Sequence, residues 1–285
     1  MAMKNFNITN YKTETEILAT LKRIGEKKLT KTAHTFDKYG EMSILEASLK
    51  STTNYSEDTK LRPAIGLISV VLAANRNYNK VVEPNIKRIE KTDLSSFDDL
   101  STLLKSKSKT EFYVFWGHKD EKKYNTLNYI LQSIEILRKE NPQIKNDFEL
   151  MNNWAVNASI KNRRQDLIGK IPNIAIATFQ HLRMTFGVDT VKPDLRVKDV
   201  LDFEFNTQRL SDENAIKAVE QIARIADLKT ITIDQIFVKY GSGYYNQEAN
   251  KLNTKQIAER LKQFGVDLDI ISKATNLSTE QIKRL

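Results

Sequence analysis

The sequence predicts an all-α protein. Apolar residues recur at helical spacing along most of the chain, as in the stripe Ile17, Leu18, Leu21 and Ile24 that follows the capping-box pattern of residues 13–16. Glycines close several of these patterns, and no internal repeat, coiled coil or strand-rich segment is present. The fold class therefore rests on periodicity, capping signals and the lack of strand signals.

The first third of the chain contains three helical patterns and then a polar stretch. The polar residues 51–58 are a candidate boundary between units. The apolar run 64–74 is short enough to be a buried strand, but its helical surroundings favour a buried helix. Pro84 is expected in the first turn of the next helix, where its missing amide costs little. The three early helical patterns cover residues 13–24, 30–39 and 42–49.

The rest of the chain shows the same pattern up to a small tail. Residues 105–109, an alternating Lys-Ser run, are expected to form a solvated turn. Residues 171–201 read as a short hairpin, an amphipathic helix, and a Pro193-Asp194 pair that opens another helix. The tail from 254 resembles a small helix-turn-helix-like unit. The other expected helices cover 95–104, 122–140, 147–157, 162–170, 211–226 and 231–240.

Composition limits the classes of function. The chain of 285 residues carries a formal charge of +9, which favours a polyanionic partner such as nucleic acid. It has no cysteine, which excludes disulfides, cysteine-bound zinc and thiolate iron–sulfur clusters, so we expect no cofactor. The three histidines have no metal-ligand spacing, and we expect no metal site. No apolar run spans a bilayer and the first residues lack a secretory signal, so we expect a cytoplasmic protein without membrane contact.

Two features of the stretch 171–201 point to chemistry. A short turn that ends at a helix N-terminus presents unpaired amides and the positive end of the helix dipole, which suit a phosphate, although an ordinary helix connection has the same pattern. Asp194 stands where a carboxylate caps the first amides of the next helix. Capping alone accounts for most aspartates at such positions.

The same stretch resembles the helix-hairpin-helix (HhH-GPD) DNA glycosylase superfamily, which includes endonuclease III and the adenine-DNA glycosylases. The family hairpin reads Leu-Pro-Gly-Val-Gly-x-Lys-Thr-Ala, followed by a helix, a glycine and Val-Asp-Thr-His-Val. Here the counterparts are residues 171–178, Gly187 and Pro193-Asp194-Leu-Arg-Val197. Residues 67–77 and the aromatic patch 112–116 with Lys123 resemble upstream family segments, so that the resemblance covers about 60–240.

The resemblance implies two helical lobes with a cleft between them that takes one extruded nucleotide. Residues 60–186 would form the central lobe and end in the hairpin. Residues 1–59 and 187–252 would form the second lobe, and residues 253–285 the small tail. The hairpin residues that would meet DNA are Asn173, Ile174, Ala175, Ala177 and Thr178.

The chain departs from the family pattern at three places. Asn173 and Ala175 replace the hairpin glycines; asparagine tolerates a left-handed backbone and alanine does so poorly. Ala177, or Ile176 if the register shifts by one, replaces the lysine with which bifunctional members form a Schiff base. Neither side chain is a nucleophile, so we expect no β-lyase activity.

Asp194 keeps the catalytic position of the family. Cleaving the bond between base and deoxyribose builds oxocarbenium-like charge on the sugar. A fixed carboxylate stabilises that charge and activates a water molecule. Asn75 would fill the gap left by a flipped base and Arg76 would contact the backbone, although helix capping accounts for both equally well.

Further residues are candidates for DNA contacts. Trp116 and Tyr113 would stack on an extruded base, although aromatics at this spacing are more often core. The candidates for phosphate contacts are Lys170, Arg183 and Lys192, although solvated surface charge is the alternative.

The sequence thus predicts a monomeric, monofunctional DNA N-glycosylase. It would flip a damaged or modified base from double-stranded DNA and hydrolyse its N-glycosidic bond, as in base excision during DNA repair. The alternative is a non-catalytic DNA-binding protein on the same fold, and a third possibility is an all-α scaffold unrelated to DNA. The sequence does not identify the base.

Overall fold

The computed structural model describes residues 6–30, 39–245 and 258–285 except 260, 264 and 276. Within these ranges the regular secondary structure is helical, and the only β-type pairings are two isolated bridges, Lys28 with Ser43 and Leu29 with Tyr245. The predicted all-α fold class is confirmed.

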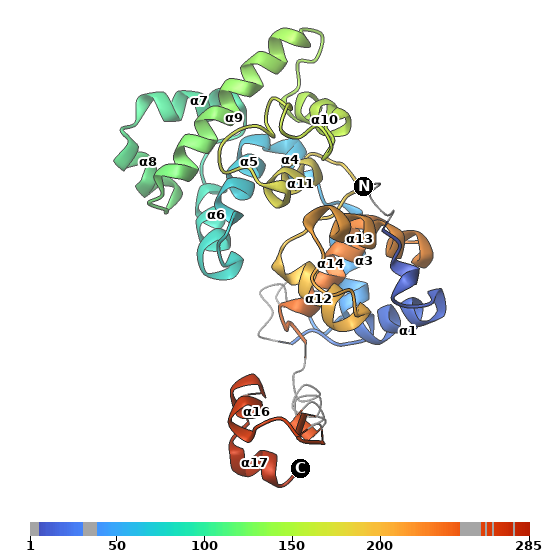
Figure 1. Cartoon of the computed structure of the whole chain (residues 1–285). Helices are drawn as coiled ribbons and strands as arrows, with labels where there is room; N and C mark the ends of the chain where they lie inside the picture. Colours follow the sequence, from blue (N-terminus) through green and yellow to red (C-terminus); the bar gives the residue numbers. More distant parts are fainter. Residues whose placement is uncertain (1–5, 31–38, 246–257, 260, 264, 276) are drawn as a thin grey trace.

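Most of the helices follow one another through short connections, whereas residues 158–175 form a long one (Figure 1). In chain order they are η1 (Ile8–Asn10), α1 (Glu14–Gly25), α3 (Ile44–Thr53), α4 (Glu57–Leu61), α5 (Pro63–Ala73), η2 (Tyr78–Val82), α6 (Glu83–Ile89), α7 (Phe97–Ser106), α8 (Lys109–Trp116), α9 (Glu121–Glu140), α10 (Asp147–Asn157), α11 (Ile176–Thr185), α12 (Leu195–Phe205), α13 (Asp212–Ala226), α14 (Thr230–Gly241), α16 (Leu268–Thr275) and α17 (Thr279–Lys283).

Local capping explains why many of these helices begin where the sequence predicts. Thr13 forms a reciprocal capping box with Glu16 at the start of α1, and Ser96 forms one with Asp99 at the start of α7. Ser211 caps α13 through the amide of Asn214. Helix α5 is almost wholly buried and carries Pro63 in its first turn, which confirms that the apolar run is a buried helix.

Two predictions of local structure are wrong, and a third falls on residues that the structure does not describe. Residues 162–170 form successive turns instead of a helix, with the Asp166 carboxylate accepting from the amides of Ile168 and Gly169. Residues 105–109 are not one turn, because α7 runs to Ser106 and Ser108 already caps α8. Most of the predicted helix 30–39 lies outside the described residues.

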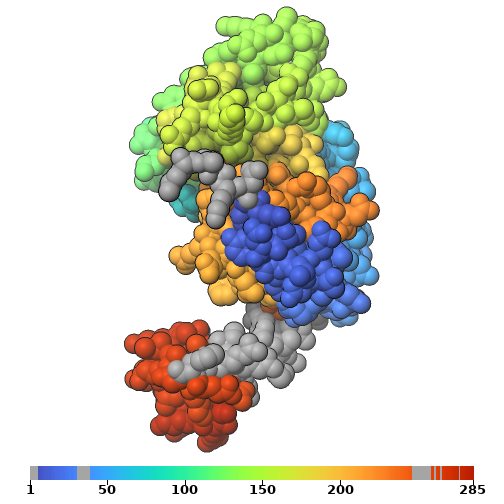
Figure 2. Space-filling view, turned by 45° about the vertical axis from the view of Figure 1, so that its right-hand side comes forward, coloured from blue at the N-terminus to red at the C-terminus, as the bar shows by residue number. Residues whose placement is uncertain are grey.

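The buried apolar residues form two large clusters. The central cluster lies within residues 64–186 and includes α5, α9 and α11. The terminal cluster combines residues from α1 and α3 with α12, α13 and α14. In Figures 1 and 2 the helices of the central cluster gather in the upper part of the view, and those of the terminal cluster below them. These clusters do not test the lobe boundaries, which stay a prediction.

The tail has its own small cluster. Ala258, Ile271 and Ile282 are buried together, with α16 and α17 packed on each other. Among the described helices, none combines the length and the apolar character that a membrane span requires.

Candidate active site

A cleft of about 620 Å³ brings together residues of both large clusters. Its lining comes from α4, α5, η2 and α6, and from α11, the turn before α12, and α14. Its ionisable lining residues are Tyr55, Asp58, Arg62, Arg76, Tyr78, Glu90, His181, Lys192, Asp194, Arg196, Asp234, Lys239 and Tyr244. A polar, charged hollow of this kind suits a polar ligand.

Asp194 lies in this cleft as the N-cap of α12. Its Oδ1 accepts hydrogen bonds from the amides of Arg196 at 3.0 Å and Val197 at 3.2 Å. Its own amide donates to the carbonyl of Lys192 at 2.7 Å, which closes a tight turn around Pro193. The cap uses one carboxylate oxygen, and Oδ2 lies 3.6 Å from Lys192 Nζ. The carboxylate is thus held rigidly while one oxygen stays beside a cation.

Among the residues that line the cleft are two nitrogen side chains, Lys192 and His181. Lys192 is half-buried, and its ammonium group faces the Asp194 carboxylate. His181 of α11 also lines the cleft. Burial, and then the positive charge of Lys192, lower the pKa of His181 well below its usual value. The imidazole is therefore neutral at pH 7.

Helix α14 adds two buried ionisable groups that the sequence reasoning missed. Asp234 is 1% exposed and Lys239 is 3% exposed, and both line the cleft. Burial, and then the nearby Asp194 carboxylate, raise the pKa of Asp234 to about 7, whereas burial lowers the pKa of Lys239 to about 8. The feature of the sequence that could have pointed to Asp234 is a single acidic residue between Ile233 and Ile236 in an otherwise apolar helical segment.

The end of α5 forms the rim of the cleft. Asn75 is exposed with a left-handed φ of 55°, next to the cleft-lining Arg76. Arg76 pairs with Asp120 at 3.0 Å and donates through Nε to His118 at 3.3 Å. Buried Lys123 donates to the carbonyls of Val71 at 2.8 Å and Leu72 at 3.0 Å, and also to that of Ala74. These bonds satisfy the last carbonyls of α5 and fix the rim.

The predicted hairpin is a turn that leads into α11 without a side-chain cap. Asn173 adopts a left-handed φ of 71°, the conformation that asparagine tolerates. Ala175 is the N-cap with an extended φ of −77°, so alanine causes no strain there. No side chain caps the first amides of α11. Exposed Lys170 precedes this turn, and Ala177 is partly exposed.

Several predicted contact residues of this region have partners within the protein. Ile174 is 3% exposed and belongs to the central cluster, and Thr178 is 9% exposed. Arg183 donates to the carbonyl of Ala155 at 2.9 Å and to Gln180 Oε1 at 2.7 Å, so it holds α10 to α11. Lys192 lies in the cleft beside Asp194. Their roles in DNA binding stay predictions.

The aromatic patch packs within the protein. Trp116 is fully buried on Phe112, and its indole N–H donates to the carbonyl of His118. Tyr113 packs edge-on against Tyr124. Neither residue lines the cleft, and α8 packs on α6 and α7. The stacking role of this patch stays a prediction.

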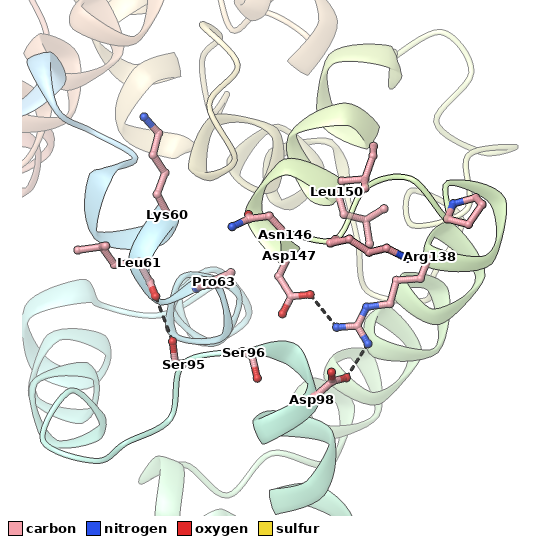
Figure 3. A pocket seen from close by; sticks show the side chains of 13 residues that line it. Lys60, Leu61, Pro63, Ser95, Ser96, Asp98, Arg138, Asn146, Asp147 and Leu150 are labelled. Carbon is pink, nitrogen blue, oxygen red and sulfur yellow. Dashed lines mark hydrogen bonds and ion pairs between the residues drawn. The ribbon is translucent and has the colours of Figure 1, made fainter.

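A second hollow of about 570 Å³ lies between α7, α9 and the start of α10 (Figure 3). Three of its charged groups form a network: Arg138 pairs with Asp98 at 2.5 Å and with Asp147 at 2.6 Å. Asp147 also accepts from the amide of Phe97 at 2.7 Å. This network joins helices, and none of the predicted site residues lies in it.

Among the described residues, no group of three or more histidine, aspartate or glutamate side chains is placed to hold a metal ion. No family model, curated protein or solved structure matches the chain.

Proposed function

We propose that the protein is a monofunctional DNA N-glycosylase whose catalytic carboxylate is Asp194. The observation that carries the proposal is the position of this carboxylate. It lines a cleft of about 620 Å³, one oxygen is fixed by two amides, and the other lies 3.6 Å from Lys192 Nζ. The resemblance to helix-hairpin-helix glycosylases supports the same assignment.

The geometry suits hydrolysis through an oxocarbenium-like transition state. Two backbone amides hold the Asp194 carboxylate at the N-terminus of α12, and a charge that is already oriented needs no reorganisation during the reaction. This carboxylate stabilises positive charge that develops on the sugar and orients or deprotonates a water molecule for attack.

DNA binding would use the exterior of the same region. The uncapped first amides of α11 and the positive end of its dipole form a phosphate site, and exposed Lys170 adds charge next to it. Asn75, exposed at the rim, would fill the gap left by the extruded nucleotide, and Arg76 would contact the backbone. The net charge of +9 favours duplex binding at low salt.

The test is base release from a panel of duplexes. Duplexes with uracil, alkylated, oxidised and hypermodified bases are incubated with the protein, and alkali reveals abasic sites as strand breaks. Asp194→Asn is expected to abolish release on each released base and to leave duplex affinity within a few-fold. The matched control is Asp212→Asn, a carboxylate that pairs with Lys198 at 2.8 Å outside the cleft. Equal release by wild type and Asp194→Asn contradicts the proposal.

Strand cleavage is expected to need the alkali step. No lysine occupies the turn before α11, so borohydride is expected to trap no imine on a duplex with a preformed abasic site. Lys192 is the amine beside Asp194. An adduct that disappears in Lys192→Met would therefore replace the monofunctional assignment by a bifunctional one.

The second candidate is a non-catalytic DNA-binding protein. The observation that favours it is that Asp194 already has a structural role as the cap of α12. Duplex binding without an abasic product on any member of the panel supports this candidate. Lack of binding to a random duplex at low salt contradicts both candidates and favours a scaffold role.

A further inference from the structure

The buried carboxylate of Asp234 is bonded to the turn that carries Asp194. Its Oδ1 accepts a hydrogen bond from the amide of Lys192 at 3.0 Å, and its Oδ2 accepts from Gln235 Nε2 at 3.2 Å. The residue is 1% exposed on α14, a helix that packs against both α3 and α12. A hydrogen bond between an ionised group and a buried amide is stronger than a neutral one.

Lys192 connects the two carboxylates. Its amide donates to Asp234, its carbonyl accepts from the amide of Asp194 at 2.7 Å, and its Nζ lies 3.6 Å from Asp194 Oδ2. Only Pro193 stands between Lys192 and Asp194, and its ring restricts the backbone of the turn. The position of Asp194 in the cleft is therefore tied to a side chain on a different helix.

The charged and titratable groups around Asp234 come from three segments. They are Tyr55 between α3 and α4, Lys192 and Asp194 in the turn before α12, and Lys239 on α14. Neutral groups of α3 complete the surroundings, since Ser51 contacts Lys239 at 3.3 Å and Thr52 contacts Thr232 at 3.0 Å. Within the described residues, Asp194 is thus the acid that shares this site with Asp234.

We propose that Asp234 is a positioning residue for Asp194, and that its negative charge adds to the field that stabilises a cation in the cleft. This inference rests on the proposed function. The hydrogen bond from the Lys192 amide fixes the conformation of the turn before α12. The negative charge of Asp234 acts on the cleft from the other side of Lys192. Asp234 therefore contributes through Asp194 and does not itself touch the reacting atoms.

A pH dependence follows from the surroundings of Asp234. Burial and the Asp194 carboxylate raise its pKa to about 7, so its charge changes across the neutral range. Above this pH Asp234 is ionised and base release is fastest. Below it Asp234 is neutral, and the rate falls towards the level that Asp194 supports alone.

The test is the pH profile of single-turnover base release between pH 5.5 and 9 on a released base. Wild type is expected to show an inflection near pH 7 with about a tenfold change in rate, which corresponds to about 1.4 kcal/mol of activation free energy. Asp234→Asn keeps an oxygen acceptor for Lys192 but no charge, and we expect a flat profile at the low-pH level. Asp234→Ala loses the acceptor too, and we expect it to be slower still. An unchanged inflection in Asp234→Asn overturns the proposal, and Asp212→Asn is expected to keep the wild-type profile.

A second measurement separates this proposal from the proposed function. If wild type releases no base, the ¹⁵N–¹H signal of the Lys192 amide is followed from pH 5.5 to 9. Titration of this signal near pH 7 in wild type and its loss in Asp234→Asn support the contact between the two residues. A Lys192 amide that does not titrate in wild type overturns the positioning role, whether or not Asp234→Asn folds.

Discussion

Helices α11 and α12 both begin after a short turn, but their N-termini are satisfied differently. The N-cap of α11 is Ala175, which has no side chain to accept from the first amides. The N-cap of α12 is Asp194, which accepts from two of them. Both cap residues have extended backbones, with ψ of 174° and −179°. The two turns therefore differ mainly in one carboxylate.

This difference assigns different chemistry to the two turns. Uncapped amides are donors that await an external anion, as at a phosphate site. Capped amides are already satisfied, and they instead fix the carboxylate that caps them. A chain that binds DNA at the first turn and hydrolyses a glycosidic bond at the second would need this division. Substitutions that exchange the caps test it.

The largest effect is expected from Asp194→Ser. Serine caps helices about as well as aspartate, so the free energy of unfolding is expected to change by less than about 1 kcal/mol. The carboxylate is lost, and base release is expected to fall by about 10²–10³-fold. Single-turnover release and urea unfolding measure the two effects separately. Asp194→Ala, which loses the cap as well, is the control. Wild-type rates in Asp194→Ser would leave Asp194 with a capping role only.

The second effect is expected from Ala175→Asp, which gives α11 the cap of α12. The extended backbone of Ala175 suits an N-cap aspartate, so the free energy of unfolding is expected to rise by about 1 kcal/mol. The same carboxylate occupies the amides and repels phosphate, and duplex affinity is expected to fall about tenfold at low salt. Anisotropy titrations measure the affinity.

The control for this experiment is Ala175→Ser, a cap without charge. We expect an intermediate affinity, because serine competes for the amides but does not repel phosphate. Unchanged duplex affinity in Ala175→Asp would show that DNA does not use this turn.

The sequence predicted the helices because their signals are local. The capping boxes at Thr13 and Ser96 satisfy amides within three residues, so they can be read without tertiary contacts. The position of Asp194 as an N-cap was readable for the same reason. Helix 162–170 was wrongly predicted because the turn there depends on Asp166, whose carboxylate bonds to amides that a helix would use otherwise.

The roles of single side chains in the site were harder to predict because long-range contacts decide them. Arginine is a common phosphate ligand, but the partner of Arg183 is the carbonyl of Ala155, which is 28 residues away. Trp116 has the spacing of either a pocket or a core residue, and only the packing of α8 decides between them. Asp234 was not singled out in the sequence, because only the packing of α14 places it beside the amide of Lys192, 42 residues earlier.

A smaller effect is expected at the turn before α11 from Asn173→Ala. Asn173 has a φ of 71°, where a Cβ without a compensating polar group costs about 1 kcal/mol. The free energy of unfolding is expected to fall by that amount in urea. Asn173→Gly is the control, since glycine adopts this φ freely, and it is expected to stay within a few tenths of a kcal/mol of wild type. Equal losses in both variants would mean that the Asn173 side chain matters more than its backbone.

The smallest effect is expected from His181→Gln. It tests whether His181 on α11 lies within electrostatic reach of Lys192 in the turn before α12. His181 lies on α11, and burial followed by the charge of Lys192 lowers its pKa well below the usual 6.5. Below pH 6.5 the unfolded chain therefore binds a proton that the folded chain does not, and stability is lost as pH falls from 6.5 towards the folded pKa. His181→Gln removes this proton, so its Tm is expected to fall less than that of wild type between pH 7 and pH 5. The same decrease in both proteins would mean that His181 is protonated in the folded state, which the ammonium of Lys192 beside it opposes.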